Sequence, residues 1–266
     1  MTIRIRYVEA FSDNYIWVLE QPDSRNVCVV DPGDADPVLR LLHAEELDLA
    51  AILLTHHHAD HIGGVEQLLH HYPAATVYGP VSSKIDSVTA PLQDADTFEL
   101  FQRRFEVLTV PGHTLDHIAY FAPVGAITGD CGLLFCGDTL FAAGCGRLFE
   151  GTPDIMYHSL GKLRCLPSAT LVYCAHEYTV ANLRFALAVE PHNSNISGRL
   201  TEALQVRAAG KPTLPSSVGL ELRTNPFLRC HIQVNERNAG PTLMDNPSNE
   251  VEVFAALRRW KDSFRA

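Results

Sequence analysis

The chain has 266 residues, of which 46% are hydrophobic and 20% charged, a composition typical of a globular protein with one large domain or two smaller ones. Its net charge of −10 and pI near 5.7 exclude a large sequence-independent nucleic-acid footprint, because such binding rests on a basic surface. Small anionic substrates remain compatible with this charge, since a few local cations outweigh distant, screened charges.

The amino-terminal residues 1–11 alternate polar and apolar side chains, which predicts a first β-strand rather than the apolar core of a signal peptide. The sequence contains no run of 18 or more apolar residues, so it predicts no membrane-spanning helix. The seven cysteines contain no CxxC pair, so we expect a reduced, cytoplasmic chain without a disulfide framework. Cys131, Cys136 and Cys145 are interpreted as small buried or loop thiols, with metal binding as the alternative.

Short strands dominate the first two thirds of the chain. Runs rich in β-branched and aromatic residues predict strands at residues 3–7, 15–19, 27–30, 51–55, 75–79, 97–101, 104–110, 117–122, 132–138 and 170–175. Helical spacing of apolar residues predicts helices at 37–47 and 62–72. The pattern therefore predicts a β-rich α/β domain over residues 1–174, whose sheets need helices to cover them.

The pattern changes to helices after about residue 175. Helical character is found at residues 176–190, 197–210 and 249–264, and a Pro- and Ser-containing stretch and a loop-like segment separate the last two. The terminal helix has acidic residues near its start and basic residues near its end, as the helix dipole favours. We therefore predict a smaller helical domain over residues 175–266.

The heptapeptide THHHADH follows one of the predicted buried strands, at the strand end where open α/β folds place their ligands. In an extended loop, His56 and His58 point the same way and His57 points the opposite way, so we interpret His57 as structural or solvent-facing. Asp60 and His61 follow near a helix start. Imidazole nitrogen and carboxylate oxygen suit zinc, iron and manganese, so the pattern favours two metals side by side over a polar loop that is merely rich in histidine.

Further ligands for such a site occur at the ends of three later strands. His113 follows the strand at 104–110, Asp138 ends the strand at 132–138, and His176 follows the strand at 170–175. Each has a glycine or alanine beside it, which makes room for a ligand. Any one of them taken alone fits a satisfied loop or core residue equally well, but their recurrence at strand ends favours a shared metal site.

The metal-binding motifs of the metallo-β-lactamase superfamily are similar to the pattern formed by seven of these residues: His56, His58, Asp60, His61, His113, Asp138 and His176. The resemblance implies an αββα sandwich, one metal held by His56, His58 and His113, and a second held by Asp60, His61 and His176. Asp138 would bridge the two metals together with a water or hydroxide. We prefer Asp138 to the nearby Asp130 because it continues into Thr-Leu-Phe as in the family pattern, whereas Asp130 falls in an expected hairpin turn.

Longer segments resemble the glyoxalase II family of hydroxyacylglutathione hydrolases: residues 13–19, 31–35, 137–152, 175–191, 224–229 and 258–262. The similarity runs from the first strand to the last helix. It implies hydrolysis of S-D-lactoylglutathione to D-lactate and glutathione, with Asp60 and Asp138 as catalytic residues and two divalent metals, zinc in the first place and iron or manganese as alternatives. No Ser-His-Asp arrangement argues for a side-chain nucleophile.

The same resemblance implies where glutathione binds. Arg258 and Lys261, spaced i, i+3 on one helical face, would hold its glycine carboxylate, although a solvated helix end is the alternative interpretation. Arg147 and Tyr178 would contact the glutathione moiety. Phe149 departs from the tyrosine of vertebrate-type enzymes, so a hydroxyl contact is lost there and Phe149 is the weakest of these assignments.

Other functions are compatible with parts of the pattern. A persulfide dioxygenase of the same superfamily would use a single iron, and the complete second-metal set argues against it. A β-lactamase function would not explain the helical carboxyl-terminal region, and this chain lacks the basic arm of a nuclease. A metal-free scaffold protein would have little need to keep every proposed metal ligand. We expect a monomer that acts on a small-molecule substrate, with no nucleic-acid or membrane partner.

Overall fold

The computed structural model describes residues 3–82, 84–125, 131–235 and 247–265 and divides the chain into two compact units. Unit 1 is Met1–Thr109 with Asp116–Gly137, and unit 2 is Val110–Leu115 with Asp138–Ala266. These units are sets of residues that lie close together in space, so they do not test the domain boundary predicted between residues 174 and 175. That boundary stays a prediction.

Unit 1 consists mainly of strands. Its first sheet is formed by β1 (Arg4–Ala10), β2 (Asn14–Glu20), β3 (Asn26–Val30), β4 (Asp48–Leu53), β5 (Thr76–Pro80) and β6 (Ala90–Leu92), in that order. Strands β1 to β3 pair antiparallel, whereas β3 to β6 pair parallel. The carboxyl ends of β3 and β4 therefore lie next to each other at one edge of the sheet.

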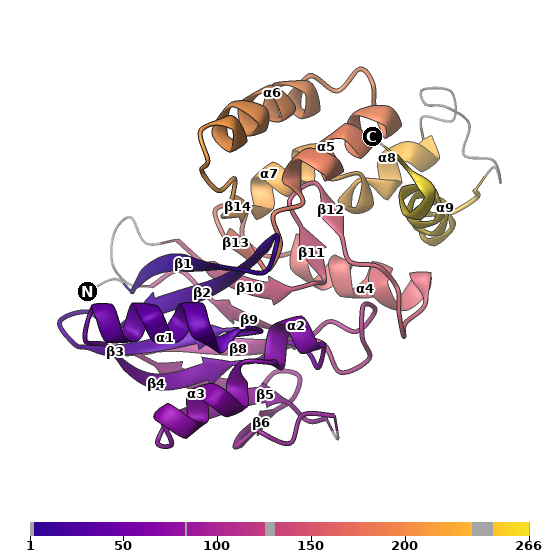
Figure 1. Ribbon diagram of the computed structural model, residues 1–266. Helices are drawn as coiled ribbons and strands as arrows, with labels where there is room; N and C mark the ends of the chain where they lie inside the picture. Colours follow the sequence, from indigo (N-terminus) through magenta and orange to yellow (C-terminus); the bar gives the residue numbers. More distant parts are fainter. Residues whose placement is uncertain (1–2, 83, 126–130, 236–246, 266) are drawn as a thin grey trace. The chain divides into compact units, whose positions relative to one another are not determined.

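Helices α1 (Ala35–Ala44) and α3 (Val65–His71) cover one face of this first sheet (Figure 1). Both helices bury an apolar stripe, with Val38 and Leu42 from α1 and Leu68 from α3 in the same core cluster as the strand residues. Asp34 caps α1 by accepting a hydrogen bond from the backbone N–H of Asp36 at 3.0 Å. The layer of helices thus fixes the segments that follow β3 and β4.

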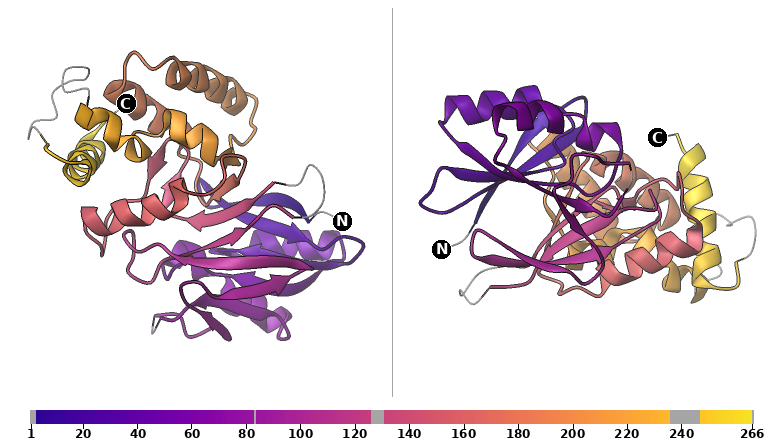
Figure 2. Two further views of the ribbon diagram at one scale, coloured as in Figure 1. Left: turned by 180° about the vertical axis from the view of Figure 1, so that it is seen from behind. Right: turned by 90° about the horizontal axis from the view of Figure 1, so that it is seen from below.

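A second sheet of unit 1 contains β7 (Thr97–Leu100), β8 (Arg103–Thr109), β9 (Ile118–Ala122) and β10 (Leu133–Gly137), paired antiparallel. It packs face to face with the first sheet, and Figure 2 shows helices, first sheet and second sheet of this unit as successive layers. The stacked rings of Tyr78 and Phe98, 4.6 Å apart, join the two sheets. Tyr120 adds a hydrogen bond of 2.7 Å from its hydroxyl to the Leu54 carbonyl, so a buried polar group is satisfied.

The helix predicted at residues 62–72 is interrupted in the structure. A short helix, α2 (Ala59–Ile62), ends before Gly63 and Gly64, and α3 begins only at Val65. A Cβ added to Gly64 would lie 2.5 Å from the backbone nitrogen of Ala35, so close backbone contact with the start of α1 requires glycine here. The break separates the end of the histidine-rich segment from α3.

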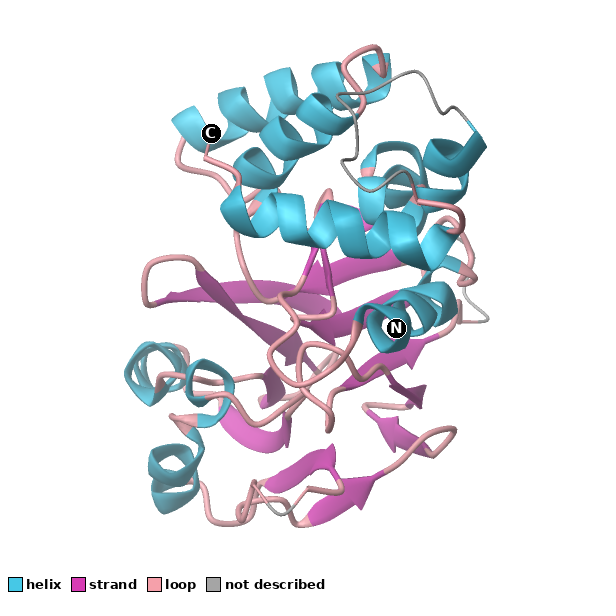
Figure 3. Cartoon of the chain, turned by 90° about the vertical axis from the view of Figure 1, so that its right-hand side faces the viewer, coloured by secondary structure: helices cyan, strands magenta, loops and turns pink. Residues whose placement is uncertain are grey.

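Unit 2 is built mainly of helices (Figure 3). They are α4 (Pro153–Arg164), α5 (Thr179–Val189), α6 (Ser194–Ala208), α7 (Val218–Thr224), the 3-10 helix η1 (Pro226–Leu228), α8 (Cys230–Asn235) and α9 (Glu250–Ser263). The predicted helices at 176–190, 197–210 and 249–264 correspond to α5, α6 and α9, whereas α4 and α7 were not predicted. None of the described helices is long and apolar enough to cross a membrane.

The short strands of unit 2 are β11 (Leu140–Phe141) with β12 (Gly144–Cys145), and β13 (Leu171–Cys174) with β14 (Ser216–Ser217). The β11–β12 hairpin is held from the helices: Asn225 donates to the carbonyls of Phe141 and Gly144 at 3.2 and 2.9 Å, and Asn182 donates to Ala142 at 3.1 Å. Buried side chains therefore hold the backbone of this hairpin in place, and this also fixes the position of the segment that follows it.

Candidate metal centre

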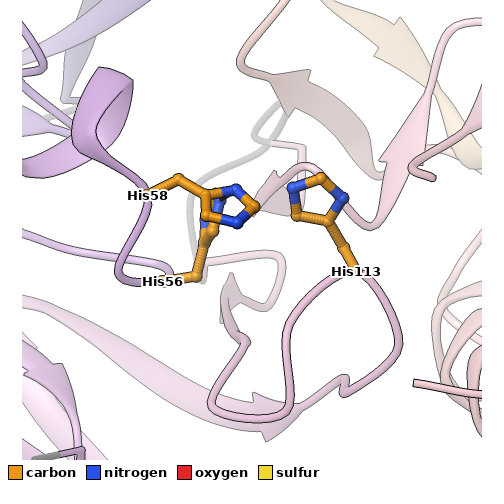
Figure 4. Close-up of side chains that lie close together, drawn as sticks. All are labelled: His56, His58 and His113. Atoms are coloured by element: carbon orange, nitrogen blue, oxygen red, sulfur yellow. Dashed lines mark hydrogen bonds between the residues drawn. The ribbon is translucent and has the colours of Figure 1, made fainter. Parts of the chain in front are cut away.

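The loop after β4 carries His56 and His58 with their rings side by side (Figure 4). Nε2 of His56 lies 3.1 Å from Nδ1 of His58, and the His56 ring is completely buried. His57 points elsewhere, with its Nδ1 2.9 Å from the Asp116 carboxylate. The loop thus separates the histidines as the extended-chain argument expects, and it aims two nitrogen atoms at one point.

Asp31, at the end of β3, connects two of these histidines, although the sequence analysis did not single it out. One carboxylate oxygen accepts from the Thr55 backbone N–H at 2.7 Å, and the other lies 2.7 Å from the Thr55 hydroxyl and 3.0 Å from Nδ1 of His61. The Thr55 hydroxyl in turn lies 3.0 Å from Nδ1 of His56. With both Nδ1 atoms occupied in this way, a metal ion would bind these two imidazoles through Nε2.

Asp60 lies in α2, beside His61. Its carboxylate oxygen lies 3.5 Å from Nε2 of His61 and accepts a hydrogen bond of 3.2 Å from the side-chain amide of Asn14. A Cβ added to Gly33 would lie 1.9 Å from the Asp60 carbonyl oxygen, so the segment after β3 approaches α2 as closely as only glycine permits. Asn14 and Gly33 therefore set the position of Asp60.

Unit 2 brings His113, Asp138 and His176 together. Nε2 of His113 lies 3.4 Å from one carboxylate oxygen of Asp138, and Nε2 of His176 lies 3.3 Å from the other. All three side chains are buried. One carboxylate thus reaches each histidine with a different oxygen, which is the arrangement of a bridging ligand. Asp130, the alternative to Asp138, lies outside the described residues.

The His113 ring is oriented by the segment after β12. Its Nδ1 donates to the Arg147 carbonyl at 2.9 Å, which leaves Nε2 to face Asp138. Gly146 passes so close to Asp138 that an added Cβ would lie 1.9 Å from the Asp138 carbonyl oxygen. The glycine beside Arg147 is thus required by a close approach of backbone to a candidate ligand.

The distances within each unit match the donor spacing of a metal ion. An ion bound tetrahedrally at about 2.0–2.2 Å places neighbouring ligand atoms about 3.4 Å apart. The His–Asp pairs above have separations of 3.3 to 3.5 Å. In unit 1, donor atoms of Asp31, His56 and His61 also lie within 4.8 Å of one another. Imidazole and carboxylate donors at this spacing fit divalent zinc, iron or manganese.

Comparisons with known proteins cover nearly the whole chain. Residues 11–176 match the model of the metallo-β-lactamase superfamily, and residues 177–264 match the model of the hydroxyacylglutathione hydrolase C-terminus. The chain is 54% identical over 261 residues to the hydroxyacylglutathione hydrolase of Alkalilimnicola ehrlichii, covering 96% of this chain and 97% of that protein. It is 49% identical over 263 residues to the hydroxyacylglutathione hydrolase of Photobacterium profundum, covering 98% and 100%.

The chain belongs to the hydroxyacylglutathione hydrolase family of the metallo-β-lactamase superfamily. This confirms the predicted fold class, an αββα metallo-β-lactamase-like sandwich with a helical carboxyl-terminal region. A solved structure described as a di-iron-bound form is 26% identical, with a TM-score of 0.58, and covers 83% of this chain and 98% of that one. The hydrolase family therefore includes this chain over its whole length, and a structural neighbour carries two metal ions.

The remaining residues predicted for this hydrolase family member lie in unit 2. Tyr178 stacks on the His176 ring with centroids 4.8 Å apart, and Phe149 meets the His113 ring edge-on at 5.2 Å. The Phe149 side chain is 63% exposed, so its ring offers an apolar surface beside a candidate ligand. Arg147 is exposed and lies 3.8 Å from Asp262. Both aromatic side chains thus flank a histidine from the solvent side.

Arg258 and Lys261 both lie on α9 but differ in their surroundings. Arg258 is only 4% exposed and donates hydrogen bonds to protein groups. Lys261 donates to the Ala181 carbonyl at 3.2 Å and lies over the rings of Phe185 and Phe264. Burial, with a smaller contribution from the nearby Arg258, lowers the pKa of Lys261 to about 8. Lys261 is therefore a cation whose charge a substrate carboxylate would stabilise.

Cysteines do not belong to this candidate centre. Within the described part of the chain, no group of side chains with metal-ligand spacing includes a cysteine, and no disulfide joins two cysteines. Burial raises the pKa of Cys145 to about 11, so this thiol stays protonated near neutral pH and is a poor metal ligand. The interpretation of Cys136 and Cys145 as buried thiols agrees with their burial.

Proposed function

We propose that this protein hydrolyses the thioester S-D-lactoylglutathione to D-lactate and glutathione, the second step of methylglyoxal detoxification. The observation that carries the proposal is the similarity to hydroxyacylglutathione hydrolases, which covers nearly the whole chain at about half identity. The burial of five of the seven predicted ligand side chains, His56, His61, His113, Asp138 and His176, supports it further.

For the metals we propose two sites with imidazole and carboxylate ligands. His56, His58 and His113 (Figure 4) would hold the first ion, and Asp60, His61 and His176 the second. Asp138 would bridge them, since its two oxygens face different histidines. We favour zinc over iron and manganese. Two such ions, when bound, lower the pKa of a shared water and stabilise negative charge on the substrate oxygen.

The protein's own carboxylates then direct the attack. We assign Asp60 the role of accepting a hydrogen bond from the attacking water, because Asn14 already holds its carboxylate in place. Asp138, buried between two imidazoles, would supply negative charge that offsets the positive charge of cations held by these histidines. The water oxygen bonds to the thioester carbonyl carbon and the carbon–sulfur bond breaks. The glutathione thiolate leaves and takes up a proton released in the reaction, so that D-lactate and glutathione are the products.

We propose that residues 175–266 form the helical domain that binds glutathione. Lys261 attracts a glutathione carboxylate, Arg147 adds a second cation with a planar fork, and Tyr178 contributes its hydroxyl. Phe149 offers an apolar contact where vertebrate-type enzymes have a tyrosine hydroxyl. Arg258 was predicted to share the carboxylate with Lys261, and its burial makes it the least accessible of these residues.

The persulfide dioxygenase alternative is not favoured, because the curated relatives that match over the full length are named hydroxyacylglutathione hydrolases. We propose a monomeric protein of the reducing cytoplasm, because the seven cysteines have no spacing typical of a disulfide framework. A net charge of −10 disfavours nucleic acid as a partner.

The test is the loss of thioester absorbance with S-D-lactoylglutathione, on protein whose metal content has been counted. We expect hydrolysis that scales with metal content up to about two ions per chain. Metal-loaded protein that leaves the thioester intact would refute the substrate. Oxygen consumption with glutathione persulfide would then identify the dioxygenase alternative.

Ligand variants test the site separately from the substrate. We expect His58→Ala and Asp138→Ala each to abolish turnover and to reduce the number of bound ions per chain, because each removes a donor. A variant that keeps near-normal turnover and the full metal count would refute the assignment of that residue.

A further inference from the structure

Asp262 lies in the last turn of α9, where the helix itself disfavours a carboxylate. The unpaired carbonyl groups at the carboxyl end of a helix carry partial negative charge, which repels an acidic side chain. Helix α9 ends at Ser263, one residue after Asp262. The cations beside Asp262, rather than the helix, therefore account for a carboxylate at this position.

Asp262 pairs with two arginines of the proposed glutathione site through a single carboxylate oxygen. Its Oδ1 accepts a hydrogen bond of 2.9 Å from Nη2 of Arg258 and lies 3.8 Å from Nε of Arg147. Burial lowers the pKa of Lys261 to about 8, and the negative charge of Asp262 opposes that shift. The cations proposed to bind the carboxylates of glutathione thus already share a carboxylate that belongs to the protein.

The contacts of Arg258 differ in their exposure to solvent. Its Nη1 donates to the carbonyls of Cys145 and Gly146 at 2.9 and 3.4 Å, and its guanidinium lies 5.2 Å from the centre of the Phe227 ring. These three partners are buried, whereas the side chain of Asp262 is 46% exposed. A carboxylate that comes from solvent would therefore meet Arg258 at Nη2, where Asp262 is bound.

The edge of the Arg258 guanidinium that holds Asp262 is only half used. Nε and Nη2 lie on the same edge of an arginine and can bind a carboxylate through two parallel hydrogen bonds. Asp262 accepts from Nη2, and Nε has no hydrogen-bond partner within the described residues. A substrate carboxylate that binds both donors makes one bond more than Asp262 does, so it can displace Asp262 at a cost in affinity.

We propose that Asp262 is an internal competitor for the glycine carboxylate of the substrate: it pairs with Arg258 and Arg147 until a glutathione thioester displaces it, and again after glutathione leaves. The inference rests on the proposed function, which supplies the carboxylate ligand. Asp262 weakens the binding of substrate and product alike, and weaker binding speeds the release of product. A ligand without that carboxylate cannot take the place of Asp262, so the competition also favours ligands that carry it.

The experiment measures the dissociation constant of glutathione for the full chain by isothermal titration calorimetry. Asp262→Asn removes a charge that the end of the helix disfavours, so the fold should tolerate it. We expect the Kd of glutathione to fall about threefold to fivefold, in line with the modest strength of partly exposed ion pairs. KM for the thioester should fall by a similar factor.

Two controls separate competition from a change in net charge. Asp154→Asn removes the same charge from α4, where the side chain is 64% exposed and faces His158, so glutathione should bind this variant as it binds wild type. The control ligand is glutathione with its glycine carboxylate esterified. Asp262→Asn should leave the Kd of the ester unchanged, because the ester has no carboxylate to replace Asp262.

The other outcomes overturn the inference or the proposed function separately. An unchanged Kd in Asp262→Asn refutes competition, and a raised Kd would mean that Asp262 orients Arg258 for the substrate. Equal tightening in Asp154→Asn, or for the ester, would assign the effect to net charge and refute competition as well. Wild-type protein that binds glutathione but leaves the thioester intact refutes the proposed reaction, and the Kd ratio still decides the role of Asp262. Absence of glutathione binding in wild type and variant would refute both.

Discussion

The carboxylate of Asp31 lies on the Nδ1 side of two proposed metal ligands, His56 and His61. It lies beside Nδ1 of His61 directly and reaches His56 through the Thr55 hydroxyl. Asp31 adopts a φ of 52°, a left-handed conformation that aspartate tolerates better than most residues because its short side chain bonds locally. One residue at the end of β3 therefore orients a proposed ligand of each metal.

Replacing Asp31 by asparagine should weaken metal binding without altering the ligands themselves. An amide does not match a carboxylate as acceptor for the Nδ1 proton of His61, so we expect zinc affinity to fall about 10-fold to 100-fold. Asp34→Asn is the matched control, because it makes the same change in charge in the same loop and asparagine caps helices as well as aspartate. Equal zinc affinities of the two variants in a chelator competition would contradict the role of Asp31.

The lowered pKa of Lys261 predicts how substrate binding depends on pH. Its pKa is lowered to about 8, chiefly by burial and also by Arg258 and Arg147, while Cys145 and Asp262 act in the opposite direction. Below this pH the ammonium is charged and attracts a carboxylate; above it the charge is lost. We therefore expect KM to be flat below about pH 8 and to rise above it. Lys261→Arg should abolish that rise, because arginine keeps its charge, and a rise unchanged in this variant would exclude Lys261 as its source.

The ligand side chains could be predicted from sequence because they cluster in one motif or follow recognisable strands. Their supporting residues could not, because each partner comes from a distant part of the chain. Asn14 contacts Asp60 across 46 positions, and Asp31 contacts His61 across 30. The segment at 31–35 was noticed only as a family resemblance, and nothing in its composition indicates that Asp31 faces a histidine.

At the scale of elements, the strands were predictable because buried strands concentrate β-branched and aromatic residues, as in β3, β4 and β9. Helix α4 was missed although its start carries a clear signal: Thr152 accepts a hydrogen bond from the Ile155 N–H, and Pro153 opens the helix. Its stripe of apolar residues is narrow, with charged and polar residues between, and this weakens the periodic pattern.

The break between α2 and α3 shows a different limit of sequence reasoning. The apolar spacing over residues 62–72 is compatible with one continuous helix, and isolated glycines are tolerated in helices. Contact with the segment after β3 overrides that pattern, because an added Cβ would lie 2.8 Å from the Gly33 carbonyl oxygen at Gly63 and 2.5 Å from the Ala35 nitrogen at Gly64. Tertiary contact rather than local propensity ends α2, and Asp60 and His61 thereby occupy a single turn of helix.

At the scale of the whole molecule, composition and charge disfavour nucleic acid as a partner but do not identify the site. The net charge of −10 coexists with three cations in unit 2, where the charges of Arg147 and Arg258 lie close enough to Lys261 to lower its pKa. A local cationic cluster on an acidic protein is compatible with an anionic substrate of small size. The global charge therefore restricts the class of partner, and the local arrangement restricts its chemistry.

An ion that binds the folded chain and not the unfolded chain stabilises the folded state, so metal binding should raise the free energy of unfolding. At a free zinc concentration 100 times the dissociation constant, each ion adds about 2.7 kcal/mol to the free energy of unfolding. For a chain of this size, about 1 kcal/mol raises Tm by about 2 °C, so we expect chelator-treated protein to gain about 5 °C for each ion restored. Differential scanning calorimetry across a zinc titration measures this gain.

Variants that lack one proposed ligand show which side chains bind the zinc ions that raise Tm. His58→Ala should lose the contribution of one ion and retain that of the other, so its Tm should rise by about half as much as that of wild type when zinc is added. Asp138→Ala, which removes the proposed bridge, should show the smallest rise of the three proteins. Identical gains in all three would mean that zinc stabilises the chain at some other place, and the bridging role of Asp138 would then be wrong. A graded response, in contrast, would tie the stability of the fold to the same side chains that carry the chemistry.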